Sequence, residues 1–208
     1  MNHYMTQNLA KIFYINLDKR TDRRDQIEEE LKQFNLYDKV ERIPAIHTPD
    51  QGILGCTMSH LATLKLAKER EYNEVLILED DFYFTITKEE FENELTQFFD
   101  SKIPYDVCMI SYKLNESTPT EYPFLQKVID GQTGSGYIVH NSFYDELIQI
   151  FEEAIPPLRD TKQHWIYAND QIWKRLQPKS NWYALTTRCG RQRDGHSDNS
   201  NKYEVYDC

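Results

Sequence analysis

VLILEDDFYF, residues 75–84, joins four aliphatic residues directly to three carboxylates, with no turn residue between them. The aliphatic run is typical of a buried β-strand, and Glu79, Asp80 and Asp81 follow at its end. Three adjacent negative charges beside apolar neighbours repel one another, so a cation or water has to offset their charge. This junction decides the expected fold, because it places an acidic cluster at the carboxyl end of a strand.

Strand and helix signals alternate around this junction. Apolar, β-rich runs predict strands over 11–17, 40–46 and 74–80, and helix-periodic segments lie between them over 18–36 and 54–72. This order predicts an α/β protein whose sheet carries helices on both faces. In such sheets ligands bind beyond the carboxyl ends of the strands, which is where the three carboxylates lie.

The second half of the chain is expected to continue with both element types. Thr87 and Glu90 form a capping-box pattern at the start of a helix, and 105–112 is expected to be a strand. We expect a loose region over 113–124 and two strands, 124–129 and 135–140, separated by a turn. A helix that starts at Ser142 is expected to end at PPLRD, 156–160. A short helix over 169–177 and a last strand over 181–187 complete one domain spanning 1–208.

The composition limits the classes of partner. The 208 residues carry a formal net charge of −10, which is unsuited to binding a nucleic acid polymer. No run approaches the roughly 18 apolar residues of a membrane span, and the N-terminus lacks a signal-peptide pattern, so we expect a cytoplasmic protein. The four cysteines match no zinc or CxxC spacing, and Cys108 is expected to be a buried free thiol.

Two segments carry candidate ligands. Residues two apart on a strand share a face, so Glu79 and Asp81 are predicted to offer oxygen ligands to Mn²⁺ or Mg²⁺. The alternative is a solvated acidic loop. The loop after the first strand presents Asn16 and three arginines that suit phosphate groups, Arg20, Arg23 and Arg24. The alternative is that these arginines pair with acids along an exposed helix.

GILGCTMSH, residues 52–60, opens the helix before the acidic strand. Its glycines permit close backbone approach, and Ser59 and His60 lie one turn into the helix. A binding role for His60 competes with that of a structural histidine in the core.

Four motifs in series, YINLDKRTDRR, GILGCTMSHLATLKLA, VLILEDDF and GSGYIVH, resemble glycosyltransferase family 25, the lipooligosaccharide and collagen galactosyltransferases. The resemblance covers roughly residues 11–140, with a looser match in NDQIW and GHSD. It implies a GT-A-like, Rossmann-type mixed sheet and a UDP-sugar donor with Mn²⁺ or Mg²⁺. It also implies inverting transfer of a hexose, galactose or glucose, to a hydroxyl of a glycan or hydroxylated-protein acceptor.

The resemblance also implies roles for particular residues. Asp170 is expected to be the catalytic base, with helix capping as its alternative and Asp194 and Asp198 as reserves. His196 is expected to join Glu79 and Asp81 on the metal, unless it is only a residue of the tail. The segment 188–208 is expected to act as a polar C-terminal lid. The residues expected to bind the donor are Asn16, Leu17, Arg20, Arg24, Ser59, His60, Asp80 and Gly136.

Two other functions remain open from the sequence. A retaining sugar transferase would not need a base at Asp170. A degenerate transferase fold would bind nucleotide-sugar or a protein partner without catalysis. A nucleotidyltransferase is disfavoured, because the chain has no glycine-rich phosphate loop with a lysine.

Overall fold

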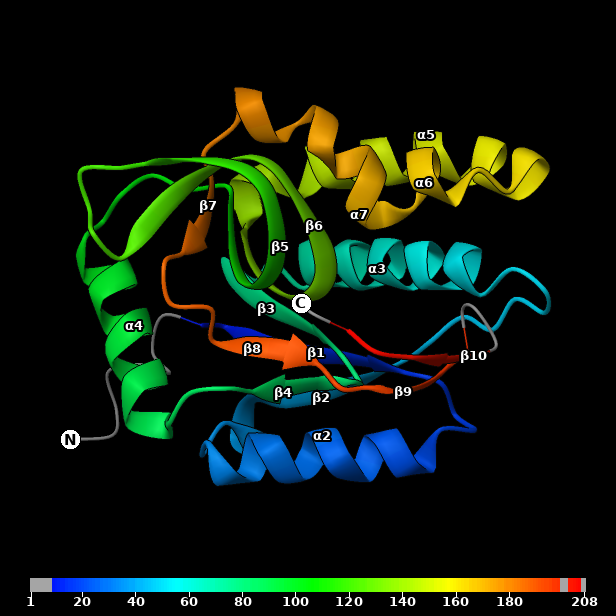
Figure 1. The fold of residues 1–208 in the computed structure, drawn as a ribbon, viewed down its shortest axis with the longest axis horizontal. Helices are drawn as coiled ribbons and strands as arrows, with labels where there is room; N and C mark the ends of the chain where they lie inside the picture. The colour runs from blue at the N-terminus through cyan, green and yellow to red at the C-terminus, as the bar shows by residue number, and fades with distance from the viewer. Residues whose placement is uncertain (1–8, 199–201, 207–208) are drawn as a thin grey trace.

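The computed structural model describes residues 9–198 and 202–206, and its centre is a six-stranded mixed sheet (Figure 1). The strand order is β2-β1-β3-β6-β5-β7. Strand β1 pairs in parallel with β2 and β3, and β7 pairs in parallel with β5, whereas β6 runs antiparallel to β3 and β5. The strands of this sheet are β1 (Lys11–Asn16), β2 (Val40–Pro44), β3 (Glu74–Glu79), β5 (Val107–Pro119), β6 (Leu125–His140) and β7 (Trp182–Leu185).

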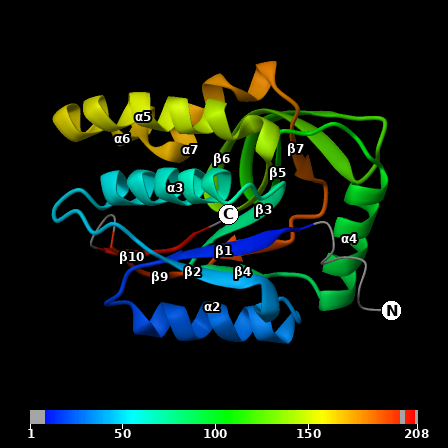
Figure 2. The same ribbon diagram turned by 180° about the vertical axis from the view of Figure 1, so that it is seen from behind.

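Helices cover both faces of the sheet, as predicted (Figures 1 and 2). Alternating residues of β1 enter two separate cores: Phe13 packs with the α3 and α5 side, and Ile12 packs with the α2 and α4 side. This double burial explains why the strands are apolar throughout. The helices are α2 (Thr21–Gln33), α3 (Gly52–Glu69), α4 (Lys88–Asp100), α5 (Tyr144–Thr161), α6 (His164–Tyr167) and α7 (Asn169–Ile172), with single 3₁₀ turns at Tyr37–Lys39, Asn141–Phe143, Trp173–Arg175 and Gln177–Lys179.

Several local predictions are confirmed. The capping box is present at α4, where the Thr87 side chain accepts from the Glu90 backbone and the Glu90 carboxylate accepts from Thr87. Cys108 is a fully buried free cysteine. Gly55 is needed at its position, because a Cβ there would lie 2.3 Å from the carbonyl oxygen of Ile46.

The prediction of a loose segment over 113–124 followed by two separate strands is wrong for much of that range. Strand β5 extends to Pro119, and β6 runs without a break from Leu125 to His140. The two strands pair along their lengths with several register shifts, which accommodate the glycines and polar residues that suggested a turn. One half of β6 pairs with β3 and the other with β7, so this hairpin joins two parts of the sheet.

The prediction that PPLRD ends the helix expected to start at Ser142 is also wrong, because α5 continues through Pro156 and Pro157 to Thr161. A proline within a helix costs about 3 kcal/mol or more. Here the apolar face continues past the prolines to the buried Leu158, and this packing offsets the lost hydrogen bonds. Ser142 does not cap α5 either, since it lies inside the preceding 3₁₀ turn.

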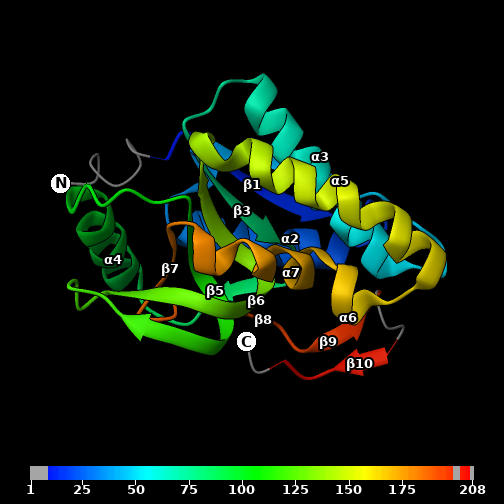
Figure 3. The same cartoon turned by 90° about the horizontal axis from the view of Figure 1, so that it is seen from above.

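Three short strands follow the segment predicted to be the last strand: β8 (Gly190–Gln192), β9 (Gly195–Ser197) and β10 (Lys202–Glu204). Strand β8 pairs with β4 (Phe82–Phe84), which begins directly after the acidic residues, and β9 pairs with β10. Figure 3 shows β9 and β10 at the edge of the molecule beyond the end of β8. The pairing of β8 with β4 therefore brings the C-terminal segment next to the carboxylates.

Within the described residues, no helix has both the length and the apolar character that crossing a bilayer requires.

Candidate functional site

The three carboxylates form a turn between two sheets. Strand β3, an interior strand, ends at Glu79, and Asp80 and Asp81 turn the chain into β4 of the small sheet. The alternation of a strand therefore stops at Glu79, and the partners of the three side chains come from several different elements. Asp80 and Asp81 are 8% and 5% exposed, so their charges have to be answered within the protein or by a ligand.

Asp80 and Asp81 share one arginine, Arg23 of α2. Its Nη1 lies 3.0 Å from Asp80 Oδ1 and 3.0 Å from Asp81 Oδ2. Asn16, at the end of β1, donates its amide to the other oxygen of Asp80 at 2.7 Å and accepts from Arg42 Nε. The first strand and the first helix thus hold the acidic turn from one side.

Glu79 is held from the opposite side by α3. His60 Nε2 lies 3.0 Å from Glu79 Oε1, and the thiol of Cys56 is 3.6 Å from the same oxygen. The other ring nitrogen of His60 lies 3.0 Å from the hydroxyl of Tyr137 on β6. His60 and Tyr137 are fully buried, so this chain of contacts fixes the Glu79 carboxylate from behind.

The surroundings shift the pKa values of the three acids in different directions. Burial and the neighbouring charge of Glu79 raise the pKa of Asp81 to about 7, against the opposing effect of Arg23. Burial also raises the pKa of Asp80, although Arg23 and Asn16 act against it. Burial is the largest influence on Glu79 and opposes its ionisation, but the contacts with His60 and Cys56 and the charge of Arg23 together outweigh burial and lower the pKa of that carboxyl. One arginine therefore leaves this cluster with excess negative charge.

Gln192, which the sequence analysis did not select, lies between two of the acids. Its Nε2 is 3.4 Å from Glu79 Oε2 and 3.4 Å from Asp81 Oδ1. The pairing of Gln192 with Phe82 across β8 and β4 brings it there. No local signal in the sequence marks it, because its position depends on the register between two short strands far apart in the chain.

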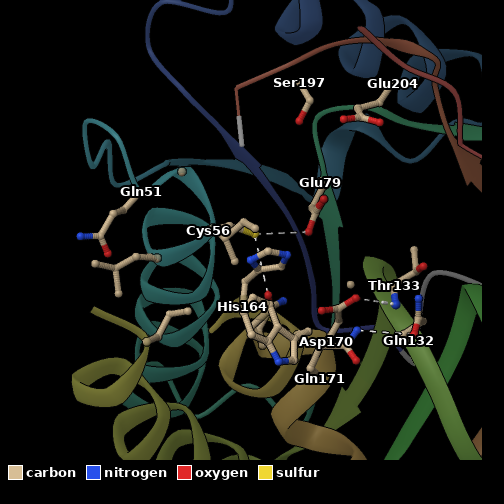
Figure 4. Close-up of a pocket in the computed structure, with 18 of the residues that line it drawn as sticks. Gln51, Cys56, Glu79, Gln132, Thr133, His164, Asp170, Gln171, Ser197 and Glu204 are labelled. Carbon is tan, nitrogen blue, oxygen red and sulfur yellow. Dashed lines mark hydrogen bonds between the residues drawn. The ribbon is translucent and has the colours of Figure 1, made fainter. Parts of the chain in front are cut away.

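Two adjoining cavities meet at the acidic turn. The larger, about 700 Å³, extends toward α6 and α7, and the smaller, about 150 Å³, extends toward β1 and α2. Figure 4 shows Glu79 and Cys56 facing each other in the larger cavity, with Asp170 on one side and Ser197 and Glu204 on the other. The residues that line both cavities are Asp50, Gly52, Cys56, Glu79, Gln192, Ser197 and Tyr206.

Asp170, the predicted base, lies on the wall of the larger cavity at the start of α7. Its Oδ2 accepts from the backbone N–H of Thr133 at 3.2 Å, and burial raises the pKa of the carboxyl. Thr133 has a φ of 85°, a conformation that is rare for a β-branched residue. Strain of this kind is retained where the surrounding structure fixes it, and here it directs an N–H at Asp170.

The predicted arginines have different surroundings. Arg20 contacts the C-terminal segment, with Nη1 2.6 Å from Asp198 Oδ2 and 3.1 Å from the His196 carbonyl oxygen. Arg24 does not contact the acidic turn: its side chain is 40% exposed, and its Nε lies 3.9 Å from Asp25 Oδ1. Arg23, which is not among the residues expected to bind the donor, is the arginine that contacts the acidic turn.

His196 lies on β9 with an exposed side chain, and its carbonyl oxygen accepts from Arg20 and Arg23. Among the described residues, the only cluster of three or more potential His, Cys, Asp or Glu ligands consists of Cys56, His60 and Glu79. His196 therefore does not complete such a cluster with Glu79 and Asp81 in this structure. Leu17 lies on the wall of the smaller cavity.

Three residues predicted to bind the donor are packed into the protein. The Ser59 hydroxyl donates to the Gly55 carbonyl and accepts from the N–H of Ile46. Gly136 packs against Phe82, where an added Cβ would lie 3.0 Å from the ring. His60 is fully buried behind Glu79. Among the glycines of β6, Gly134 is the one that lines the larger cavity.

Comparison with solved structures defines the class of this fold. A glycosyltransferase involved in the glycosylation of the major capsid of PBCV-1 matches with a TM-score of 0.57 and 12% identity. The match covers 91% of this chain and 94% of that one. The mixed sheet with helices on both faces is therefore a GT-A-like, Rossmann-type fold, as expected.

The family follows from the sequence comparison. A family model described as glycosyltransferase family 25 (LPS biosynthesis protein) matches residues 48–171, more than half of the chain. The chain belongs to glycosyltransferase family 25. Procollagen galactosyltransferase 2 of Homo sapiens is 28% identical over 116 residues, which is 44% of this chain and 18% of that protein. The chain thus matches less than a fifth of the length of this relative.

Proposed function

We propose that the protein is a metal-dependent, inverting glycosyltransferase. It moves a hexose, galactose or glucose, from a UDP-sugar to a hydroxyl of a glycan or of a hydroxylated protein. The observation that carries this proposal is the position of the acidic turn, where two cavities meet, with Asp170 on the wall of the larger one. Membership of family 25 supports the class of reaction.

The oxygen atoms of Glu79 and Asp81 fit a hard divalent ion. Glu79 Oε2 and Asp81 Oδ1 each lie 3.4 Å from Gln192 Nε2, and an ion that takes the place of this amide would have both carboxylates as ligands. The excess negative charge of the turn favours a cation there. Bound Mn²⁺ or Mg²⁺ supplies positive charge against the diphosphate that leaves the sugar. His196 would need a rotation of β9 or of its side chain to join this pair.

The smaller cavity gives the donor its polar contacts. Leu17 and Arg23 line it, and Asn16 holds Asp80 from behind. Arg23 and Arg20 are the arginines best placed for donor phosphates, because both lie near the acidic turn or the C-terminal segment. Arg24 would have to leave the exposed face of α2 to take part.

Asp170 is proposed to take the proton of the acceptor hydroxyl. As that oxygen forms its bond to the anomeric carbon, the bond from this carbon to the diphosphate breaks, and the configuration inverts. One carboxylate oxygen is held by Thr133 N–H, so the carboxylate is oriented on the cavity wall. A raised pKa makes it a stronger base than an exposed aspartate.

The segment 188–208 is proposed to act as a lid over the donor. Its described part already contacts the site through Gln192, and Arg20 and Arg23 hold the His196 carbonyl. These contacts come from the backbone and from Gln192, so they do not require the imidazole of His196.

Asp81→Asn tests the proposal. We expect Mn²⁺ with UDP-galactose or UDP-glucose to raise the melting temperature of the parent protein and to support slow donor hydrolysis. The variant should lose both the metal-dependent shift and, by on the order of 10³-fold, the hydrolysis rate. Its melting temperature without metal should not fall, because the substitution removes a charge that burial disfavours.

The alternatives predict different outcomes of the same assays. A degenerate fold that only binds would show the thermal shift without hydrolysis or transfer. A retaining transferase would give a product of the donor's own anomeric configuration, which proton NMR of the product distinguishes. Full activity of Asp81→Asn would remove this carboxylate from the metal site.

A further inference from the structure

A cluster of different chemistry lies beside the acidic turn. Ligand atoms of Cys56, His60 and Glu79 all lie within 4.8 Å of one another. In the proposed function Glu79 has a role, whereas the thiol of Cys56 has none and His60 only supports Glu79. A thiol, an imidazole and a carboxylate together form a ligand set typical of zinc rather than of magnesium or manganese.

The distances fit a tetrahedral ion. With Zn–N and Zn–O bonds of about 2.0 Å and a Zn–S bond of about 2.3 Å, tetrahedral angles place N and O about 3.3 Å apart and S and O about 3.5 Å apart. The structure has 3.0 Å between His60 Nε2 and Glu79 Oε1, and 3.6 Å between Cys56 Sγ and the same oxygen. These two separations differ from the tetrahedral values by about 0.3 Å or less, and the ligand atoms of Cys56 and His60 lie within 4.8 Å of each other.

The surroundings orient the imidazole for such an ion. His60 Nδ1 lies 3.0 Å from the Tyr137 hydroxyl, which can accept its proton and leave Nε2 free to bind a metal. Metal-binding histidines commonly have a hydrogen-bond partner of this kind on the second ring nitrogen. Both rings are fully buried and cannot turn toward solvent instead.

An ion can reach the cluster, and a fourth ligand is close. Cys56 and Glu79 line both cavities, so the cluster opens to solvent on one side. The amide of Asn169 is 4% exposed, and its Nδ2 has no hydrogen-bond partner among the described residues. Its Oδ1 lies 3.9 Å from Cys56 Sγ, near enough to take the fourth position directly or through water.

We propose that Cys56, His60 and Glu79 form a binding site for a thiophilic divalent ion of the zinc class, separate from the oxygen pair of Glu79 and Asp81. Binding releases the thiol proton to solvent, and the thiolate and carboxylate neutralise the ion. Glu79 offers Oε1 to this site and Oε2 to the oxygen pair, and repulsion between two divalent ions on one carboxylate makes occupation of one site oppose occupation of the other. This exclusion rests on the proposed function. It makes zinc an inhibitor that competes with the activating ion.

Cobalt(II) is the probe for the site itself, and it needs no turnover. We expect the parent protein with Co²⁺ to show the sulfur-to-cobalt charge-transfer absorption of a thiolate ligand. Cys56→Ser should lose this band, and Cys56→Ala provides a second variant if the first does not fold. Asp81→Asn should keep the band, because it changes only the oxygen pair.

Cys208→Ser controls for the cysteine outside the described residues: the band persists in this variant if Cys56 supplies the thiolate. Cys108 and Cys189 are fully buried in the opposite core, so they are not expected to contribute. Absence of the band at saturating Co²⁺, or its persistence in both Cys56 variants, would overturn the site.

Activity then tests the exclusion separately. Zn²⁺ should inhibit Mn²⁺-supported donor hydrolysis by the parent, and Cys56→Ser should need at least about tenfold more Zn²⁺ for equal inhibition. A cobalt band together with zinc-insensitive hydrolysis would retain the site and overturn the exclusion. A cobalt band in a protein that never hydrolyses or transfers a sugar would retain the site and contradict the proposed function.

Discussion

The two sides of the acidic turn differ in how their polar groups are satisfied. Toward the smaller cavity, Asp80 and Asp81 meet Arg23, and Asn16 links Asp80 to Arg42. Toward the larger cavity, Asp170 accepts from a backbone N–H, and the buried Asn169 Nδ2 has no partner among the described residues. The cavity is about 150 Å³ on the first side and about 700 Å³ on the second.

This difference separates a side on which the protein itself already pairs the carboxylates from a side on which a buried amide has no partner among the described residues. Buried polar groups are nearly always hydrogen-bonded, so an unpartnered amide beside a large cavity indicates a place where a ligand or water completes the contacts. On the smaller side the arginine and asparagine already hold the carboxylates. Substitutions there should affect stability first, and substitutions on the larger side should affect catalysis first.

Arg23→Met should have the largest effect on stability. It leaves Asp80 and Asp81 without their arginine, and breaking such a buried pair costs about 3–5 kcal/mol. Arg24→Met, one residue away and exposed, should change the free energy of unfolding by no more than about 0.5 kcal/mol. Denaturant unfolding of both variants measures the difference, and equal losses would show that the smaller side is not held by Arg23.

Asp170→Asn should lower the transfer rate by about 10²-fold or more, because general-base catalysis contributes at least that much. The amide oxygen can still accept from Thr133, and the variant loses a charge that burial disfavours, so its melting temperature should not fall. Asp160→Asn, on the exposed end of α5, is the matched control. A normal transfer rate would fit the retaining alternative instead.

The stability of the metal-free protein should depend on pH. The pKa of Asp81 is about 7 in the folded protein, above its ordinary 3.8, so the folded state favours the protonated form. The stabilisation is present below about pH 4 and is lost as the pH rises toward about 7. The metal-free protein should therefore lose stability over this range, and Asp81→Asn should lose less.

Mn²⁺ binding should show the opposite trend. The ion displaces a proton from Asp81, so its affinity should rise by up to about tenfold per pH unit and level off above about pH 7. Titration calorimetry at several pH values measures this slope. An affinity independent of pH would mean that Arg23 already keeps Asp81 ionised. The negative charge of the carboxylates on the smaller side would then be fully balanced by the protein.

The positions of the arginines along α2 distinguish the one that contacts the acidic turn from the one that is exposed. Ile27 and Leu31, four residues apart, mark the buried face of α2. Arg23 lies one further turn back on the same face, whereas Arg24 is rotated by about 100° toward solvent. Helical periodicity alone could therefore have selected Arg23 as the arginine directed at the sheet.

No local sequence feature could have corrected the predictions for α5 and β6. The two prolines in α5 and the glycines in β6 carry strong signals for a break, and each was outweighed by packing or pairing with distant elements. Propensity reports the cost of a residue in a helix or strand, but it does not report the apolar area that the tertiary fold buries in return.

The sequence by itself determined the alternation of strands and helices, the position of Glu79, Asp80 and Asp81 at the end of an interior strand, and the motifs of family 25. These features are local, because they depend on periodicity and on residue type. Only the tertiary structure decided that Gln192 lies between two acids, that Cys56 and His60 reach Glu79, and that Thr133 orients Asp170. Each of these contacts joins segments far apart in the chain, and its distance is set by strand register and helix packing, which no single segment encodes.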